Sequence, residues 1–355
     1  MNFEIGSRSI GEKQSCFITF EAGATHSGVE NAKQLVELAA KAGADAVKFQ
    51  IFKNVDRLVA DKQQLFSYQV LVDRESDQTE EVQEPLYNIL CRRSLTREEW
   101  KEVKAVADQQ NLGFFATVGF PEDIELLQEL GCHSIKIASS DVNHHPLIQK
   151  AAKTGMCLQL DTGNSTIGEI EEAVDLILQE GNQNIIIHQC PSGYPARLES
   201  INLNIIPTLK QMFQVPIAYS DHTPGWDMDV AAVALGANLV EKTITLDRTT
   251  RSVEHIFSLE PSEMKQFVNV IRDVEMALGD PRRYMSETER QKRLATRRSC
   301  FYSQAVQKGE TITEDDIEYR RPGYGIPPKE AKRIIGSRLR QDCPEGRQIE
   351  WTDLE

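Results

Sequence analysis

Polar residues that could do chemistry stand where short apolar runs end, in a pattern that repeats along most of the chain. If these runs are parallel strands of one closed sheet, their C-terminal ends meet at one rim, where polar residues serve a site. Carboxylates at such a rim can transfer protons, and lysines and hydroxyls can hold an anion. The residues at these ends are Glu21, Lys48, Gln50, Thr117, Lys136, Ser139, Asp141, Ser192, Tyr194, Ser220, Asp221, His222 and Glu241.

Two lysines at these ends, Lys48 and Lys136, are the candidate cations of an anion-binding site. Hydroxyls at neighbouring ends would suit a phosphorylated anion, and these belong to Thr117, Ser139 and Ser220. The alternative is that each lysine forms a buried ion pair with a carboxylate such as Glu21 or Glu241. The convergence of two lysines with three hydroxyls favours the anion site.

Proton transfer and metal binding have their own candidates. Glu21 and Asp141 form a possible acid–base pair, although a barrel carboxylate is often only the partner of a lysine. His222 lies in "SDHTPGW" (residues 220–226), directly after the apolar run "VPIAY". By residue type alone, a lone histidine at a strand end more often orients a neighbour or binds substrate than holds a metal ion.

Eight apolar runs alternate with amphipathic helical stretches. The runs are "FITFEAG", "AVKFQI", "GFFATV", "SIKIAS", "MCLQLDTG", "IIIHQC", "IAYSDH" and "LVEKTITL". The sequence also marks the ends of helices. Thr96 with Glu99 predicts a capping box, and Gly43 marks the end of the helical stretch at residues 31–42. This alternation predicts a (β/α)8 TIM barrel. The alternative is a doubly wound open sheet. The usual nucleotide-binding loops of such sheets are missing, because no G-x-G-x-x-G follows the first run and the chain contains no G-x-x-x-x-G-K-[ST].

Composition changes along the chain predict its domains. Residues 1–279 hold the barrel, with a long insert at residues 53–93 that is expected to cover a site. Residues 280–298 are charged and lack apolar periodicity, which predicts a linker. Residues 299–355 contain two copies of G-x-x-I-x-x-x-D-[IL]-E, within 308–318 and 345–355, which predicts a small domain with pseudo-symmetric halves.

Charge and cysteine content limit the partners and the location. The 40 Lys+Arg and 54 Asp+Glu give a net charge of −14, which argues against nucleic acid or a membrane surface as a partner. The N-terminus has no signal-peptide pattern and no apolar run is long enough to cross a bilayer, so a cytoplasmic protein is expected. The seven cysteines include no C-x-x-C pair, which predicts free thiols.

Motifs in order along the chain resemble those of the sialic acid (N-acetylneuraminate) synthase family, which includes pseudaminic and legionaminic acid synthases and spore-coat polysaccharide proteins. "EAGATHSG" is similar to E-[AI]-G-x-N-H-x-G, "AVKFQ" to V-K-x-Q, "IKIASSD" to Y-K-I-x-S-G-E, and "LDTGNST" to L-S-T-G-M. "CPSGYP" is similar to C-T-x-x-Y-P, and "SDHT" is the same tetrapeptide. "VALGANLVEKTITLDR" is similar to V-A-L-G-A-x-x-[IV]-E-[KR]-H-x-T-x-D-R, and "RRPGYGI" to the K-R-P-G-x-G-I of a C-terminal antifreeze-like (SAF) domain.

The resemblance implies that phosphoenolpyruvate condenses with the open-chain aldehyde of an N-acylated hexosamine, giving a nine-carbon 2-keto sugar acid and phosphate. It implies catalytic roles for Glu21, Asp141 and His222. Matching motif positions imply phosphoenolpyruvate contacts from Lys48, Gln50, Thr117, Lys136, Ser139 and Ser220, and sugar contacts from Tyr194, Ser192, Asp221 and Arg321. Arg321 would come from the partner subunit of a domain-swapped homodimer.

Three departures from the family pattern bear on catalysis. Thr243 stands where E-[KR]-H has a metal-binding histidine, Asp141 replaces the glutamate of S-G-E, and Glu254 replaces the aspartate of G-P-D-H. Our hypothesis is that the longer Glu254 fills the vacancy, so that His222 and Glu254, with His255 or Glu21 and waters, hold Mn²⁺ or Mg²⁺. The alternative is metal-independent catalysis, with Lys242 or backbone donors polarising the aldehyde.

Three functions follow from these observations. The leading prediction is a synthase of nonulosonic (sialic) acids. A divergent synthase could instead join phosphoenolpyruvate to another aldose or aldehyde. The third reading is a sugar-binding homologue without catalysis, which the joint presence of Glu21, both lysines, His222 and Arg321 argues against.

Overall fold

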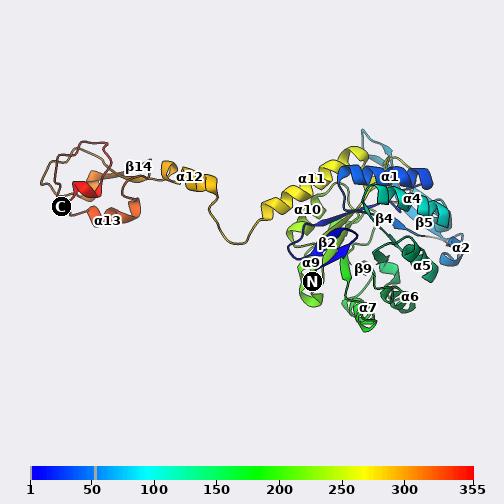
Figure 1. Cartoon of the computed structure of the whole chain (residues 1–355). Helices are drawn as coiled ribbons and strands as arrows, with labels where there is room; N and C mark the ends of the chain where they lie inside the picture. The colour runs from blue at the N-terminus through cyan, green and yellow to red at the C-terminus, as the bar shows by residue number, and fades with distance from the viewer. Residues whose placement is uncertain (1, 52–53) are drawn as a thin grey trace. The chain divides into compact units, whose positions relative to one another are not determined.

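The computed structural model describes residues 2–51 and 54–355. It divides into two compact units, Met1–Gly279 and Asp280–Glu355 (Figure 1). The predicted linker, residues 280–298, falls in the second unit and contains helix α12 (Glu287–Thr296), none of whose residues is buried. Each unit has its own buried apolar cluster.

The first unit is built on a closed barrel, which confirms the predicted (β/α)8 fold and excludes the open sheet. Neighbouring barrel strands are parallel throughout. In chain order the strands are β3 (Phe17–Glu21), β4 (Ala46–Gln50), β7 (Gly113–Thr117), β8 (Ser134–Ile137), β9 (Cys157–Asp161), β10 (Ile185–Gln189), β11 (Ile217–Asp221) and β12 (Leu239–Thr243). All eight runs identified in the sequence form these strands.

Helices surround this barrel (Figure 1). They are α1 (Val29–Ala42), α4 (Arg97–Gln109), α5 (Pro121–Glu129), α6 (His145–Ala152), α7 (Ile167–Gln179), α9 (Ile205–Phe213), α10 (Asp227–Ala234) and α11 (Pro261–Leu278). The Thr96–Glu99 capping box forms as predicted, and Gly43 ends α1 in the left-handed conformation (φ 91°) that suits glycine. The apolar faces of these helices pack on the outer side of the strands in one continuous core.

Two additions close the ends of the barrel. The hairpin of β1 (Asn2–Ile5) and β2 (Arg8–Gly11) packs Ile5 and Ile10 against strand residues such as Phe17 and Phe115. At the opposite end, the predicted insert contains α2 (Val55–Leu58), the hairpin of β5 (Leu65–Asp73) and β6 (Gln78–Pro85), and α3 (Leu86–Cys91). Its apolar residues cluster with Val253 from the segment after β12, so the insert folds over the strand ends.

The second unit has the internal symmetry that its repeated motif predicts. It contains β13 (Ser299–Tyr302), β14 (Ile317–Arg320) and α13 (Ala331–Ile334), with 3-10 turns η3 (Glu314–Asp316), η4 (Pro328–Glu330) and η5 (Trp351–Asp353). Val306 and Cys343 exchange two backbone hydrogen bonds of 2.9 Å across the symmetry axis. Asp316 accepts from Gln304 Nε2 at 2.6 Å, and its counterpart Asp353 accepts from Gln341 Nε2 at 2.7 Å.

All seven cysteines are free thiols, as the sequence predicts. Within residues 2–51 and 54–355, no helix combines the length and apolar character needed to span a membrane.

Candidate active site at the mouth of the barrel

A cavity of about 530 Å³ opens at the C-terminal ends of the barrel strands. Ten of the residues singled out in the sequence line it: Glu21, Lys48, Gln50, Thr117, Ser139, Asp141, Tyr194, His222, Glu241 and Glu254. Leu58, Val59, Leu86 and Leu90 of the insert form an apolar part of its wall. The barrel topology therefore brings together residues that lie far apart in the sequence.

A larger cavity of about 790 Å³ lies beside α7 and α9. The described residues that line it include no Lys, Arg, Asp, Glu or His, so it lacks the acid, base and cation groups that catalysis needs. The smaller cavity is therefore the candidate active site.

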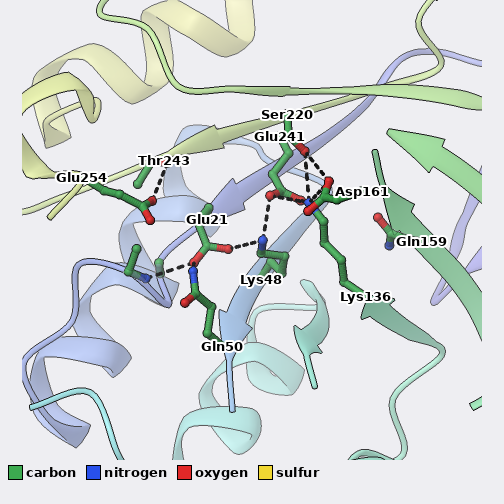
Figure 2. Close-up of polar contacts among 12 residues, drawn as sticks. Glu21, Lys48, Gln50, Lys136, Gln159, Asp161, Ser220, Glu241, Thr243 and Glu254 are labelled. Carbon is green, nitrogen blue, oxygen red and sulfur yellow. Dashed lines mark hydrogen bonds and ion pairs between the residues drawn. The ribbon is translucent and has the colours of Figure 1, made fainter. Parts of the chain in front are cut away.

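Five charged side chains form what we call the mouth cluster: Glu21, Lys48, Lys136, Asp161 and Glu241 (Figure 2). Lys48 Nζ lies 2.7 Å from Glu21 Oε2 and 2.7 Å from Glu241 Oε1. Lys136 Nζ donates to both Glu241 oxygens at 2.7 Å and lies 3.1 Å from Asp161 Oδ1. Glu241 thus contacts both lysines. Buried ion pairs between lysines and carboxylates, the alternative to an anion site in the sequence analysis, are therefore present in the structure.

The pKa values in the mouth cluster follow from burial and these ion pairs. Burial alone would lower the pKa of Lys136, but Asp161 and Glu241 outweigh it and raise that pKa. For Lys48, burial outweighs Glu241 and lowers the pKa. Burial would raise the pKa of Glu241, but the two lysines outweigh it and hold that pKa well below its usual range.

A hydrogen-bond chain behind the mouth cluster fixes Ser220. Ser134 Oγ donates to the Cys157 carbonyl and accepts from Gln159 Nε2 at 2.8 Å, so Gln159 Oε1 must accept from His188 Nε2, also at 2.8 Å. His188 Nδ1 then accepts from Ser220 Oγ at 2.9 Å, and Ser220 accepts from Lys136 at 3.0 Å. Burial and Lys136 lower the pKa of His188 to about 3, so this chain is neutral apart from its lysine.

The two predicted acid–base residues sit in different surroundings. Glu21 accepts from the Ala24 backbone N–H at 3.0 Å and from Gln50 Nε2 at 3.4 Å. Only glycine fits beside it, because a Cβ at Gly23 would lie 2.7 Å from Glu21 Oε1 and 2.3 Å from the Gln50 backbone nitrogen. Asp141 lies in the 3-10 turn η1 (Ser139–Asp141), where burial raises its pKa. A raised carboxyl pKa suits a group that both takes up and gives back a proton.

His222 lines the cavity, and one of its two ring nitrogens already has a hydrogen-bond partner. Its Nδ1 lies 3.2 Å from the Pro191 carbonyl oxygen, which can only accept, so in the neutral ring Nδ1 carries the proton and Nε2 keeps a lone pair. The ring packs against Tyr194 and Phe257, with centroid distances of 4.6 and 5.8 Å. This tautomer is the one that a metal ligand or a hydrogen-bond acceptor requires.

Glu254 is held in a conformation that glutamate rarely adopts. Its φ is 76°, in the left-handed region, and Thr243 Oγ1 lies 3.5 Å from its Oε2. His255, the next residue, bonds Thr245 Oγ1 at 2.8 Å and does not line the cavity. Among the described residues no group of three or more His, Cys, Asp or Glu side chains is arranged to hold a metal ion. His222 and Glu254 are therefore the candidate metal ligands, and they are fewer than a complete metal site needs.

Three residues predicted to contact the sugar do not line the cavity. Ser192 lines the larger cavity and donates to the Gly163 carbonyl at 3.0 Å. Asp221 points to the other face of β11, where it pairs with Lys242, so the expected sugar contact does not fit its position. Arg321 belongs to the second unit.

Lys242, Asp221 and Asp229 form a second group of charges, which we call the sealed cluster. Lys242 Nζ contacts Asp221 Oδ2 and lies 3.7 Å from Asp229 Oδ2, and all three side chains have 0% exposure. Lys242 is therefore not placed to polarise a substrate carbonyl, contrary to one alternative from the sequence. Burial and the neighbouring Asp221 raise the pKa of Asp229, which is thus the protonated member of the pair.

Asp161 is a cavity residue that the sequence reasoning missed. It ends β9, two positions after Gln159, and alternate strand residues share a face. A carboxylate at that position of a barrel strand was a readable signal, since Gln159 and Asp161 both point into the barrel, toward His188 and Lys136 respectively.

Comparison with known proteins identifies the family of each unit. Residues 35–283 match the NeuB family and residues 297–355 match the SAF domain. The N,N'-diacetyllegionaminic acid synthase of Legionella pneumophila is 35% identical over 356 residues, covering 99% of this chain and 98% of that protein. The pseudaminic acid synthase of Campylobacter jejuni (strain 81-176) is 31% identical over 355 residues, covering 99% of both.

A solved structure supports the same assignment. The N-acetylneuraminic acid (sialic acid) synthetase of Leptospira borgpetersenii, in complex with citrate, is 28% identical with a TM-score of 0.71, covering 82% of this chain and 95% of that one. Together with the barrel and its lysine-bearing mouth, these matches confirm the predicted resemblance: the chain belongs to the NeuB family and carries a C-terminal SAF domain.

Proposed function

We propose that this chain is a nonulosonic acid synthase, which condenses phosphoenolpyruvate with the open-chain aldehyde of an N-acylated hexosamine. The products are a nine-carbon 2-keto sugar acid and phosphate. The observation that carries the proposal is the meeting of Lys48, Glu21 and Asp141 at one cavity, with the buried Lys136 paired to the cavity residues Asp161 and Glu241, in a chain whose relatives are named as synthases of such acids.

Phosphoenolpyruvate carries a carboxylate and a phosphate, and the mouth of the barrel offers donors for both. Lys48 and Lys136 supply positive charge, and the hydroxyls of Thr117 and Ser139 line the same cavity. Ser220 acts indirectly in this arrangement, because its hydrogen bond to Lys136 orients that ammonium group. Charge-assisted hydrogen bonds of this kind are the strong ones in anion recognition.

The reaction needs one proton given and one proton taken. Carbon C3 of phosphoenolpyruvate forms a bond to the aldehyde carbon, and the aldehyde oxygen becomes a hydroxyl by gaining a proton. Water adds to C2 and loses one proton. When the C2–O bond to phosphate breaks, the new C2 hydroxyl gives its remaining proton to the departing phosphate and becomes the keto group. We assign the proton transfers to Asp141, because burial raises its pKa, and we assign to Glu21 the placing of Lys48 and Gln50.

A divalent metal ion, Mn²⁺ or Mg²⁺, would be held by His222 Nε2 and Glu254, with water and substrate oxygens as the other ligands. Such an ion supplies polarisation of the aldehyde carbonyl when bound. The free lone pair on His222 Nε2 supports this role, and Thr243, which stands where the family motif has a second histidine, offers only a hydroxyl near Glu254.

Sugar binding and assembly extend the same proposal. Tyr194, which lines the cavity beside His222, is the candidate sugar contact from the barrel. The family resemblance supports a cytoplasmic, domain-swapped homodimer in which Arg321 of a second copy completes the sugar site.

The test is release of phosphate from phosphoenolpyruvate by the purified full-length chain, with a panel of N-acylated hexosamines and with or without Mn²⁺. We expect release that requires a sugar and a matching yield of 2-keto acid. Release with a simple aldose alone would point to the divergent synthase, and no release with any sugar would favour a sugar-binding protein.

A further inference from the structure

The mouth cluster holds more negative than positive charge before any substrate arrives. Its two lysines face three carboxylates, those of Glu21, Asp161 and Glu241. A substrate that brings a carboxylate and a phosphate dianion into this cavity meets lysines whose charge is already matched. One of the three carboxylates must therefore give way or lose its charge, because a buried excess of negative charge is costly.

The three carboxylates are not held equally. Glu241 contacts both lysines at 2.7 Å, and its side chain is 5% exposed. Glu21 is 4% exposed and accepts from a backbone N–H as well as lying 2.7 Å from Lys48. Asp161 is 13% exposed and lies 3.1 Å from Lys136, the longest of these ion pairs. Asp161 is therefore the least tightly held of the three carboxylates.

The hydrogen bonds made by Lys136 and Ser220 also single out Asp161. The three N–H groups of Lys136 are matched by Ser220 and by the two oxygens of Glu241. The one O–H of Ser220 lies 2.9 Å from His188 Nδ1, which must accept, against 3.3 Å from Asp161. Lys136 therefore holds Asp161 mainly through charge, and the contact of Asp161 with Ser220 Oγ is the longer of the two that this hydroxyl can make; Figure 2 marks both contacts of Asp161.

We propose that Asp161 is a displaceable counterion of Lys136. An anionic oxygen of phosphoenolpyruvate takes its place beside Lys136, and the displaced carboxylate takes up a proton, so that binding of this substrate weakens as pH rises. Asp161 thereby sets the affinity for the anion and its pH dependence. This inference rests on the proposed use of phosphoenolpyruvate, and it assigns a role to a position where the similar motif L-S-T-G-M has a serine.

Most titratable groups around Asp161 are excluded as the proton acceptor. The titratable groups that act on it or feel its charge are Lys136 on β8, His188 and Cys190 on or just after β10, Tyr194 beyond β10, Glu241 on β12 and Lys48 on β4. His188 is neutral with its pKa lowered to about 3, and burial raises the pKa of Cys190 and of Tyr194. The pKa of Glu241 is held low by both lysines, so it gains no proton near neutral pH. Lys48, whose pKa burial lowers, is the competing proton acceptor, and proton uptake that persists in D161N would point to it.

The experiment is calorimetric titration of the full-length chain with phosphoenolpyruvate and no sugar, in two buffers of different ionisation enthalpy. It is run between about pH 7 and about pH 8.5, where the phosphate of the ligand is already a dianion. We expect uptake of close to one proton per ligand and a Kd that rises by up to about tenfold per pH unit. This measurement needs no variant, so it decides the question even if a substitution disturbs folding.

Two variants locate the proton. D161N should abolish proton uptake, remove the pH dependence and tighten binding about tenfold near pH 8, because the competing charge is gone. D175N is the matched control, since it removes one exposed carboxylate from α7, the helix that follows β9, and should behave as the unsubstituted chain.

Three results would overturn the inference: binding without proton uptake, proton uptake that D161N retains, or weaker binding by D161N in a folded protein. Absence of any binding would overturn the proposed function as well. Binding with the expected proton uptake, but without condensation onto any sugar, would leave this inference standing and contradict the proposed function.

Discussion

Two buried lysine–carboxylate clusters lie in the same barrel, and only one of them faces the cavity. The sealed cluster pairs Lys242 with Asp221 and Asp229, and all three side chains have 0% exposure. The mouth cluster also buries its lysines, but Asp161 keeps 13% of its surface exposed and lines the cavity. We propose that the same residue types serve stability in one place and ligand binding in the other.

Strand geometry explains the difference. Glu241 and Lys242 are consecutive on β12, and so are Ser220 and Asp221 on β11, so members of each pair point to opposite faces. Glu241 and Ser220 point into the barrel toward Lys136. Lys242 and Asp221 point outward and meet each other under the helix layer. The contrast predicts that lysine substitutions in the two clusters will have opposite consequences for stability and activity.

The largest expected effect is loss of stability in the sealed cluster. K242M leaves Asp221 buried without its cation, which should lower the free energy of unfolding by about 3–5 kcal/mol. Chemical denaturation of the variant and of the unsubstituted chain measures this change. A K242M protein as stable as the original but inactive would reverse the assignment of the two clusters.

K136M should instead lose activity with a smaller loss of stability than K242M, because Glu241 keeps Lys48 as a cation 2.7 Å away. Removing this cation takes away a charge-assisted contact to the anion, so kcat/KM for phosphoenolpyruvate should fall about 100- to 1000-fold. Steady-state phosphate release gives the rate, and circular dichroism checks the fold. Full activity in K136M would contradict a role for Lys136 in anion binding.

D141N tests the proton transfers. Losing a general acid–base group should lower kcat about 100-fold with little change in KM for phosphoenolpyruvate. Because burial raises the pKa of Asp141, its base form is lost as pH falls through that raised value, at a higher pH than for an ordinary aspartate. The acidic limb of the kcat profile should disappear in D141N, and D141E is the conservative control. An acidic limb that is unchanged in D141N would mean that another group transfers the protons.

The smallest effect is expected at the edge of the cavity. Y194F keeps the ring packed on His222 but removes one hydroxyl, so KM for the sugar should rise about 3- to 10-fold. KM for phosphoenolpyruvate should stay the same, which initial-rate measurements with each substrate varied in turn would show. Equal changes in both constants would mean that Tyr194 acts on the whole site rather than on the sugar.

Much of the fold was readable from the sequence because its signals are local. Apolar runs, capping boxes such as Thr96–Glu99 and glycine stops mark each strand and helix, and the barrel follows from their alternation. The same arithmetic placed Lys48, Asp141 and His222 around one cavity, because strand ends converge.

What the sequence did not reveal depends on side-chain direction and on parts outside the barrel. Asp221 was expected at the sugar although Ser220, its neighbour, already occupies the inner face. Asp161 was passed over although its spacing from Gln159 puts it on that inner face. Ser192 sits on a loop, where no strand period fixes the direction of a side chain, and it faces the larger cavity.

The central claim is that the mouth cluster holds phosphoenolpyruvate for condensation with an N-acylated hexosamine. Mass spectrometry of the products made by the unsubstituted chain and by K136M tests this most directly. We predict a nine-carbon 2-keto acid and an equal amount of phosphate from the unsubstituted chain, and at most about a hundredth of the rate from K136M. The same product at the same rate from K136M, or no product from the unsubstituted chain with any sugar, would contradict the claim.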